Sequence, residues 1–136
     1  MTQMPSIDDP RRLREILDRA LELASRHGLH SVLVGVAGPE GDPVFPEVVR
    51  YVESGLRVDD SVFRMTRERV VLLLTDVGAA RAEGIVERLL VEFSEHFPSV
   101  ADPKVEVQCF EVDPGTIELT LKQVLPRLFP GPAAPH

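Results

Sequence analysis

Apolar residues recur along the chain at two spacings, and these spacings divide it into eight predicted elements. Four segments place an apolar residue every three or four positions, as one face of a helix does: 10–27, 48–56, 79–96 and 119–128. Four shorter runs, apolar or alternating and bounded by turn residues, predict strands: 30–37, 61–65, 70–75 and 105–112. The predicted order is therefore α-β-α-β-β-α-β-α.

This order predicts an α+β domain in which an antiparallel sheet carries helices mainly on one face, in the ferredoxin-like manner. The run 70–75 is continuously apolar, so we expect it to be a central strand. The domain is expected to span 10–129. A flexible lead (1–9) precedes it, and a tail rich in proline and glycine (130–136), expected to be disordered, follows it.

The composition limits the classes of function. The chain has 136 residues, 43% of them hydrophobic, which suits one compact domain. Its formal net charge of −7 argues against binding to nucleic acid or to anionic membranes, since both normally require a basic excess. The chain has no long apolar run and no apolar signal segment, so we expect neither membrane insertion nor export. Cys109 is the single cysteine, which is typical of a reducing compartment, and we expect a cytoplasmic protein.

A charged stretch in the middle of the chain carries the most specific pattern. Arg57 and Asp60 form an R-x-x-D sequence, and the five residues 61–65 separate it from Thr66-Arg67-Glu68-Arg69-Val70. This arrangement resembles the centre of the GGDEF (diguanylate cyclase) family, in which an inhibitory R-x-x-D site precedes the catalytic hairpin G-G-[DE]-E-F by five residues. In this resemblance Arg57 and Asp60 match the inhibitory site, whereas Thr66 and Arg67 replace the two glycines.

The hairpin keeps one of the two acidic residues that the family carries. Glu68 matches the first acid, Arg69 replaces the second, and Val70 stands where the family has phenylalanine. Arg64 matches an arginine that often precedes the glycines. Weaker matches extend the resemblance over roughly 10–129, and together they imply a nucleotidyl-cyclase-like fold.

The first strand also departs from the family pattern. In the family it ends in D-[ILV]-D, which binds metal, and an F-K-x-x-N-D segment that binds the nucleotide follows. Here the strand ends Gly35-Val36-Ala37, and the nucleotide segment is deleted, since Gly41-Asp42 comes almost at once. Phosphoryl transfer from a triphosphate needs Mg²⁺, and Mg²⁺ needs carboxylate oxygens. The resemblance therefore implies a degenerate domain without catalytic residues, metal or cofactor, and we expect no enzyme activity.

The first functional hypothesis is a protein-interaction or adaptor module in a bacterial signalling or assembly system. It requires a protein partner, and the resemblance also makes an antiparallel homodimer plausible. Its partner surface would be the degenerate hairpin: Arg64, Thr66, Arg67, Glu68 and Arg69. The simpler interpretation is that arginines on a hairpin face solvent without a partner.

The second hypothesis is a receptor for cyclic di-GMP. An arginine fork such as that of Arg57 can pair bidentately with the O6/N7 edge of guanine, and Asp60 can accept from its N1–H and amino groups. The structural alternative is that Arg57 and Asp60 cap a helix end and form a surface ion pair. A third hypothesis is an enzyme with a remodelled pocket.

Overall fold

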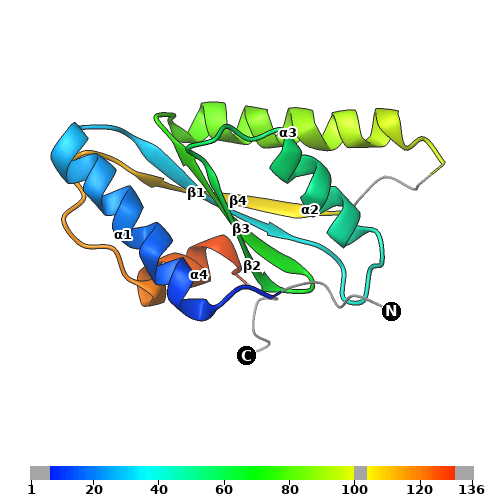
Figure 1. Ribbon diagram of the computed structural model, residues 1–136, viewed down its shortest axis with the longest axis horizontal. Helices are drawn as coiled ribbons and strands as arrows, with labels where there is room; N and C mark the ends of the chain where they lie inside the picture. The colour runs from blue at the N-terminus through cyan, green and yellow to red at the C-terminus, as the bar shows by residue number, and fades with distance from the viewer. Residues whose placement is uncertain (1–6, 100–103, 131–136) are drawn as a thin grey trace.

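The computed structural model of the protein describes residues 7–99 and 104–130, and within them it contains four strands and four helices (Figure 1). In chain order the elements are α1 (Pro10–His27), β1 (Ser31–Ala37), α2 (Phe45–Ser54), β2 (Ser61–Thr66), β3 (Arg69–Thr75), α3 (Ala79–His96), β4 (Glu106–Val112) and α4 (Leu121–Leu128). This is the order that the periodicity predicts. The flexibility expected of 1–6 and of 131–136 lies outside the described residues. None of the four helices is long and apolar enough to cross a membrane.

The four strands form one antiparallel sheet in the order β2-β3-β1-β4. β3 lies inside the sheet, as its continuous apolar sequence predicts, and every residue from Val70 to Thr75 is buried. A two-residue turn at Arg67 and Glu68 joins β2 to β3, and the register is irregular between Arg64 and Thr66. Because β3 and β1 occupy the middle of the strand order, β2 and β4 are the two edges of the sheet.

Helices cover both faces of the sheet (Figure 1), so the prediction that they lie mainly on one face is wrong. α2 and α3 pack on the face that carries Val32 and Val34, whereas α1 and α4 pack on the face that carries Leu33. The physical reason is that β1 and β3 are apolar at almost every position. Such a strand has two apolar faces, and each face needs a layer of helices to exclude water.

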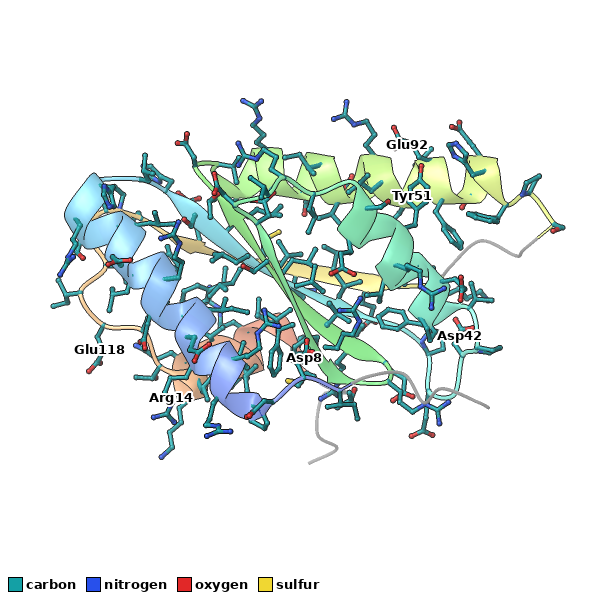
Figure 2. The ribbon with its side chains drawn as sticks, in the orientation of Figure 1. Asp8, Arg14, Asp42, Tyr51, Glu92 and Glu118 are labelled. Carbon is teal, nitrogen blue, oxygen red and sulfur yellow. The ribbon has the colours of Figure 1, made fainter. Side chains whose placement is uncertain are left out.

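The residues before α1 fasten this helix to one edge of the sheet. The Asp9 carboxylate caps α1 by accepting from the Arg11 backbone N–H at 3.0 Å, and hydrogen bonds from Arg11 lower the pKa of Asp9. Asp8 lies beside β2 (Figure 2). Its backbone N–H donates to the Arg64 carbonyl oxygen at 2.9 Å, and its carboxylate accepts from the Arg64 backbone N–H at 2.8 Å. This contact pairs part of an otherwise open strand edge.

Candidate functional site

The segment from Arg57 to Asp60 is a tight turn between α2 and β2, and Asp60 holds it closed. The Asp60 side chain is 4% exposed. Its Oδ2 accepts from the Arg57 backbone N–H at 3.0 Å, and its Oδ1 accepts from the Thr75 backbone N–H at 3.0 Å. The Thr75 hydroxyl also donates to Oδ1, at 3.3 Å. Asp60 therefore ties the turn to the end of β3, and both of its oxygens have partners within the protein.

The Arg57 side chain is only partly engaged in the same turn. Its Nη2 donates to the Thr75 carbonyl oxygen, and its Nε lies 3.6 Å from Oδ2 of Asp60. The side chain nevertheless remains 57% exposed. The neighbouring Val58 is almost fully exposed, so the tip of the turn projects into solvent. The turn presents the guanidinium of Arg57 to solvent, whereas the carboxylate of Asp60 is already hydrogen-bonded to Arg57 and Thr75.

The hairpin turn and the R-x-x-D turn lie at opposite ends of the same strand. β3 has seven residues, from Arg69 beside the hairpin turn to Thr75 beside Asp60. At about 3.3 Å per residue, the two candidate sites are about 20 Å apart. The structure therefore does not bring the two groups of candidate residues together.

Glu68 connects the hairpin turn to the loop between β1 and α2. Its carbonyl oxygen accepts from the Gly38 N–H at 2.8 Å, and its carboxylate accepts from the Gly41 N–H at 3.4 Å. The Thr66 hydroxyl accepts from the Glu68 backbone N–H at 3.2 Å, which tightens the turn itself. The one acid that the hairpin keeps thus serves to hold neighbouring loops in place.

The three arginines of the hairpin have different surroundings. Arg64 pairs with Glu53 of α2, with 2.6 Å between Nη2 and Oε1. The Arg69 guanidinium lies 5.4 Å from the centre of the Phe129 ring, a cation–π contact with the residue that follows α4. Arg67, at the tip of the turn, is exposed and makes no ion pair within residues 7–99 and 104–130. Arg67 is thus the hairpin arginine most open to a partner.

In the resemblance to the GGDEF pattern, Gly35 and Ala37 match the positions of the metal-binding acids. α4 packs so closely on Gly35 that a Cβ atom there would lie 2.7 Å from Cβ and 2.7 Å from the carbonyl oxygen of Leu128. Ala37 lies between Arg69 of β3 and Glu106 of β4 in the strand register. In the part of the chain that the structure describes, no three His, Cys, Asp or Glu side chains are grouped so that they could hold a metal ion.

A cavity that the sequence analysis missed lies beside Ala37, on the face of the sheet that α4 covers. Its volume is about 330 Å³. Its lining includes Ala37 and Gly38, Arg69 of β3, Glu106 and Gln108 of β4, and Phe129. These residues are far apart in the sequence and meet only through the strand register. Hydrophobic periodicity does not reveal which strands pair, so the sequence pattern gives no signal for this cavity.

An aromatic cluster joins α2 to α3 on the other face of the sheet, where Tyr51 and Glu92 lie (Figure 2). The Tyr51 ring packs edge to face on Phe93, with 5.9 Å between the ring centres, and its hydroxyl lies 3.3 Å from Nδ1 of His96. Loss of hydration at this contact raises the pKa of Tyr51, and the negative charge of Glu92 raises it further. The phenol therefore stays protonated at neutral pH and serves to hold the two helices together.

No family model matches the sequence, and no curated protein matches it. Solved structures do resemble the fold. The diguanylate cyclase SiaD of Pseudomonas aeruginosa, solved in complex with its activator SiaC, has a TM-score of 0.68 and 25% sequence identity, over 91% of this chain and 55% of that chain. The GGDEF domain of FimX, also from Pseudomonas aeruginosa, has a TM-score of 0.69 and 14% identity, over 90% of this chain and 89% of that chain.

A third similar structure contains a nucleotide. The GGDEF domain of DgcB from Caulobacter crescentus, solved in complex with c-di-GMP, has a TM-score of 0.61 and 18% identity, over 85% of this chain and 82% of that chain. At identities this low, FimX and DgcB inform the fold alone. The chain also spans little more than half the length of SiaD, so the activity of SiaD belongs to a longer protein.

Proposed function

We propose that this chain, a domain with the GGDEF-like fold, binds a protein partner and does not synthesise cyclic di-GMP. The predicted fold class, an α+β nucleotidyl-cyclase-like fold, is confirmed by the antiparallel sheet and by the similarity to the FimX domain. The contact between Gly35 and Leu128 supports the second part of this proposal, the absence of cyclic di-GMP synthesis. A metal-binding carboxylate has no room at position 35 while α4 lies there, and Ala37 supplies no oxygen from its side chain.

The hairpin supports the same conclusion. Glu68 is the one carboxylate in the turn, and one of its oxygens already accepts from Gly41. Arg69 replaces the second acid with a positive charge, which opposes Mg²⁺ binding. Arg67 replaces a glycine, and its side chain occupies space that glycine leaves for the close approach of a nucleotide to the backbone. These substitutions support a domain that keeps the fold and lacks the groups that phosphoryl transfer requires.

The exposed tip of the hairpin is the partner surface that we propose. Arg67 is at its centre and has no ion pair within the described residues, so it favours a partner that presents carboxylates. SiaD was solved in complex with its activator SiaC, so a protein of this fold can bind another protein. A cytoplasmic adaptor in a bacterial signalling or assembly system is the role that fits such a surface.

A receptor for cyclic di-GMP is the second candidate, and the exposure of Arg57 favours it. DgcB was solved in complex with c-di-GMP. In the present geometry Arg57 can reach a guanine base from solvent, but Asp60 can accept from the base only if it gives up its bonds to Thr75 or to the Arg57 backbone. Recognition of the guanine base would then depend on Arg57 alone. We therefore favour the adaptor function over the receptor function.

The absence of turnover is tested with GTP and Mg²⁺. We expect the purified protein to release no pyrophosphate above a heat-inactivated control. Release that requires Mg²⁺ and is lost in Glu68→Gln would contradict the proposal, because it would show that the remaining hairpin acid is catalytic. The same assay with an active diguanylate cyclase verifies that turnover is detectable.

The two binding functions are separated by two further measurements. In affinity purification from a bacterial lysate, a protein retained by the wild type and by Arg50→Glu, but lost with Arg67→Glu, supports the hairpin surface. Arg50 is a matched control because it is an exposed arginine on α2. Equal retention by the Arg67 variant would contradict that surface. Calorimetric titration with cyclic di-GMP, repeated with Arg57→Ala, favours the receptor if binding is present and is lost in the variant.

A further inference from the structure

The cavity beside Ala37 is distinct from the R-x-x-D turn and from the tip of the hairpin. Its base is the last residue of β1, and one of its walls is the end of α4, where Leu128, Phe129 and Pro130 line it. The volume of about 330 Å³ is within the range of sites for small molecules. This wall is apolar, whereas the residues from the neighbouring strands are polar.

Two opposite charges flank the base of the cavity. Ala37 is paired in register with Arg69 on one side and with Glu106 on the other. Adjacent strands are about 4.8 Å apart, so the Cα atoms of Arg69 and Glu106 are about 10 Å apart. Because alanine has only a methyl group, it leaves the space between the two charged side chains open.

The polar groups that face this space have no ion-pair or hydrogen-bond partners within residues 7–99 and 104–130. Neither Arg69 nor Glu106 makes an ion pair in the described part of the chain, and the Gln108 side chain has no hydrogen bond there. Stacking on Phe129 holds the Arg69 guanidinium in place while its N–H groups remain available. A guanidinium, a carboxylate and a carboxamide, all on solvent-exposed residues, therefore line one cavity without an ion-pair or hydrogen-bond partner in the described part of the chain.

The geometry points to a binding site for a small zwitterion, specifically a free α-amino acid with an apolar side chain. Its carboxylate binds the guanidinium fork of Arg69, and its ammonium group binds Glu106. Its side chain lies against Leu128 and Phe129. A simple anion would face Glu106 and a simple cation would face Arg69, so each singly charged ligand meets one like charge. This site goes beyond the proposed function, since it needs neither a protein partner nor a nucleotide.

The test is a titration followed by the backbone amide signals of the protein in ¹⁵N–¹H spectra, with three related probes. L-Leucine carries both charges, N-acetyl-L-leucine carries only the carboxylate, and L-leucinamide carries only the ammonium group. We expect L-leucine to shift the signals of Ala37, Gly38 and Gln108 and to saturate. Each singly charged analogue is expected to bind at least tenfold more weakly.

Three variants connect the shifts to the cavity. Arg69→Gln and Glu106→Gln are each expected to weaken L-leucine binding at least tenfold, whereas Arg67→Gln, on the adjacent turn, leaves it unchanged. Ala37→Leu fills the base of the cavity without changing its charge and is expected to abolish the shifts. Glu106 is exposed on an edge strand, so Glu106→Gln remains a valid test if the Ala37 variant does not fold.

Several results would overturn the assignment. The first is the absence of saturable shifts up to about 10 mM L-leucine. Equal binding of N-acetyl-L-leucine would show that Glu106 does not recognise an ammonium group. Unchanged binding in Arg69→Gln, or equal weakening in Arg67→Gln, would place the ligand elsewhere.

Discussion

Thr75 donates two hydrogen bonds to a single carboxylate oxygen of Asp60, one from its backbone N–H at 3.0 Å and one from its hydroxyl at 3.3 Å. Asp60 lies directly before β2 and Thr75 ends β3, so the pair closes the open end of this hairpin. The side chain of Asp60 is almost fully buried, and so is Thr75. A buried carboxylate is stable only where hydrogen bonds replace its water. Asp60 therefore has a structural role that does not depend on any ligand.

Asp60→Ala is expected to lower the free energy of unfolding by about 3 kcal/mol. The substitution leaves the donors of Arg57 and Thr75 without an acceptor, and hydrogen bonds to charged groups each contribute about 1.5–3 kcal/mol. Urea unfolding followed by circular dichroism measures the change. Asp59→Ala is the matched control, because Asp59 is the exposed neighbour and its loss is expected to change stability by less than about 0.5 kcal/mol. Equal stability of the two variants would exclude the structural role of Asp60.

Ser31 and Thr75 give a paired test, since they are partners in the register of β1 and β3. The Ser31 hydroxyl is fully buried and has no hydrogen-bond partner among the described residues, whereas the Thr75 hydroxyl donates to Asp60. Ser31→Ala is therefore expected to leave the unfolding free energy unchanged or to raise it by up to about 1 kcal/mol. Thr75→Val, which keeps the shape but loses the bond, is expected to lower it by about 1 kcal/mol. Thermal unfolding of both variants would refute this if the two changes had the same sign.

The order of the elements can be predicted from the sequence because each element has a strong local signal. α1 and α3 each keep one apolar stripe over 18 residues, and β3 is apolar throughout. The layering is harder to predict. Val32 and Leu33 are both apolar and point to opposite faces of β1. No local sequence pattern indicates which helix covers which face.

The geometry of the candidate sites depends on contacts between residues distant in sequence, which periodicity does not report. The R-x-x-D spacing identifies Arg57 and Asp60, but it does not identify Thr75, which bonds to both. The position of Gly35 within β1 likewise gives no sign that Leu128 lies against it. Strand register and helix docking decide both contacts, and these emerge only from the packed fold.

Gly35→Ala tests how firmly α4 packs against Gly35 of β1. We expect the variant to lose about 2 kcal/mol of stability, because the new methyl group would lie 2.7 Å from both Cβ and the carbonyl oxygen of Leu128. Gly84→Ala is the matched control in α3, where nothing lies within 4 Å of the new Cβ, and it is expected to gain about 1 kcal/mol. Urea unfolding measures both. A Gly35 variant as stable as the wild type would mean that α4 moves aside easily, which would weaken the argument against metal binding.

Cys109 gives a prediction about reactivity and pH. The thiol is half-buried on β4, and its burial, together with the negative charges of Glu83 and Glu87, raises its pKa. The thiolate is the reactive form, and a raised pKa means less thiolate at any pH near the ordinary value of about 8.5. At about pH 8 we therefore expect Cys109 to react with iodoacetamide more slowly than free cysteine. The rate should rise with pH along a curve whose midpoint lies above that of free cysteine.

The contribution of the carboxylates to this pKa can be isolated with two variants. Glu83→Gln removes one of the negative charges that raise the pKa of Cys109, so its reaction curve is expected to shift towards lower pH. Glu15→Gln changes the net charge by the same amount on α1, on the opposite face of the sheet, and is expected to leave the curve in place. Rates of alkylation of Cys109, measured across the pH range in the wild type and in both variants, give the midpoint of each reaction curve. A wild-type midpoint at or below that of free cysteine, or equal shifts in the two variants, would contradict the assigned cause.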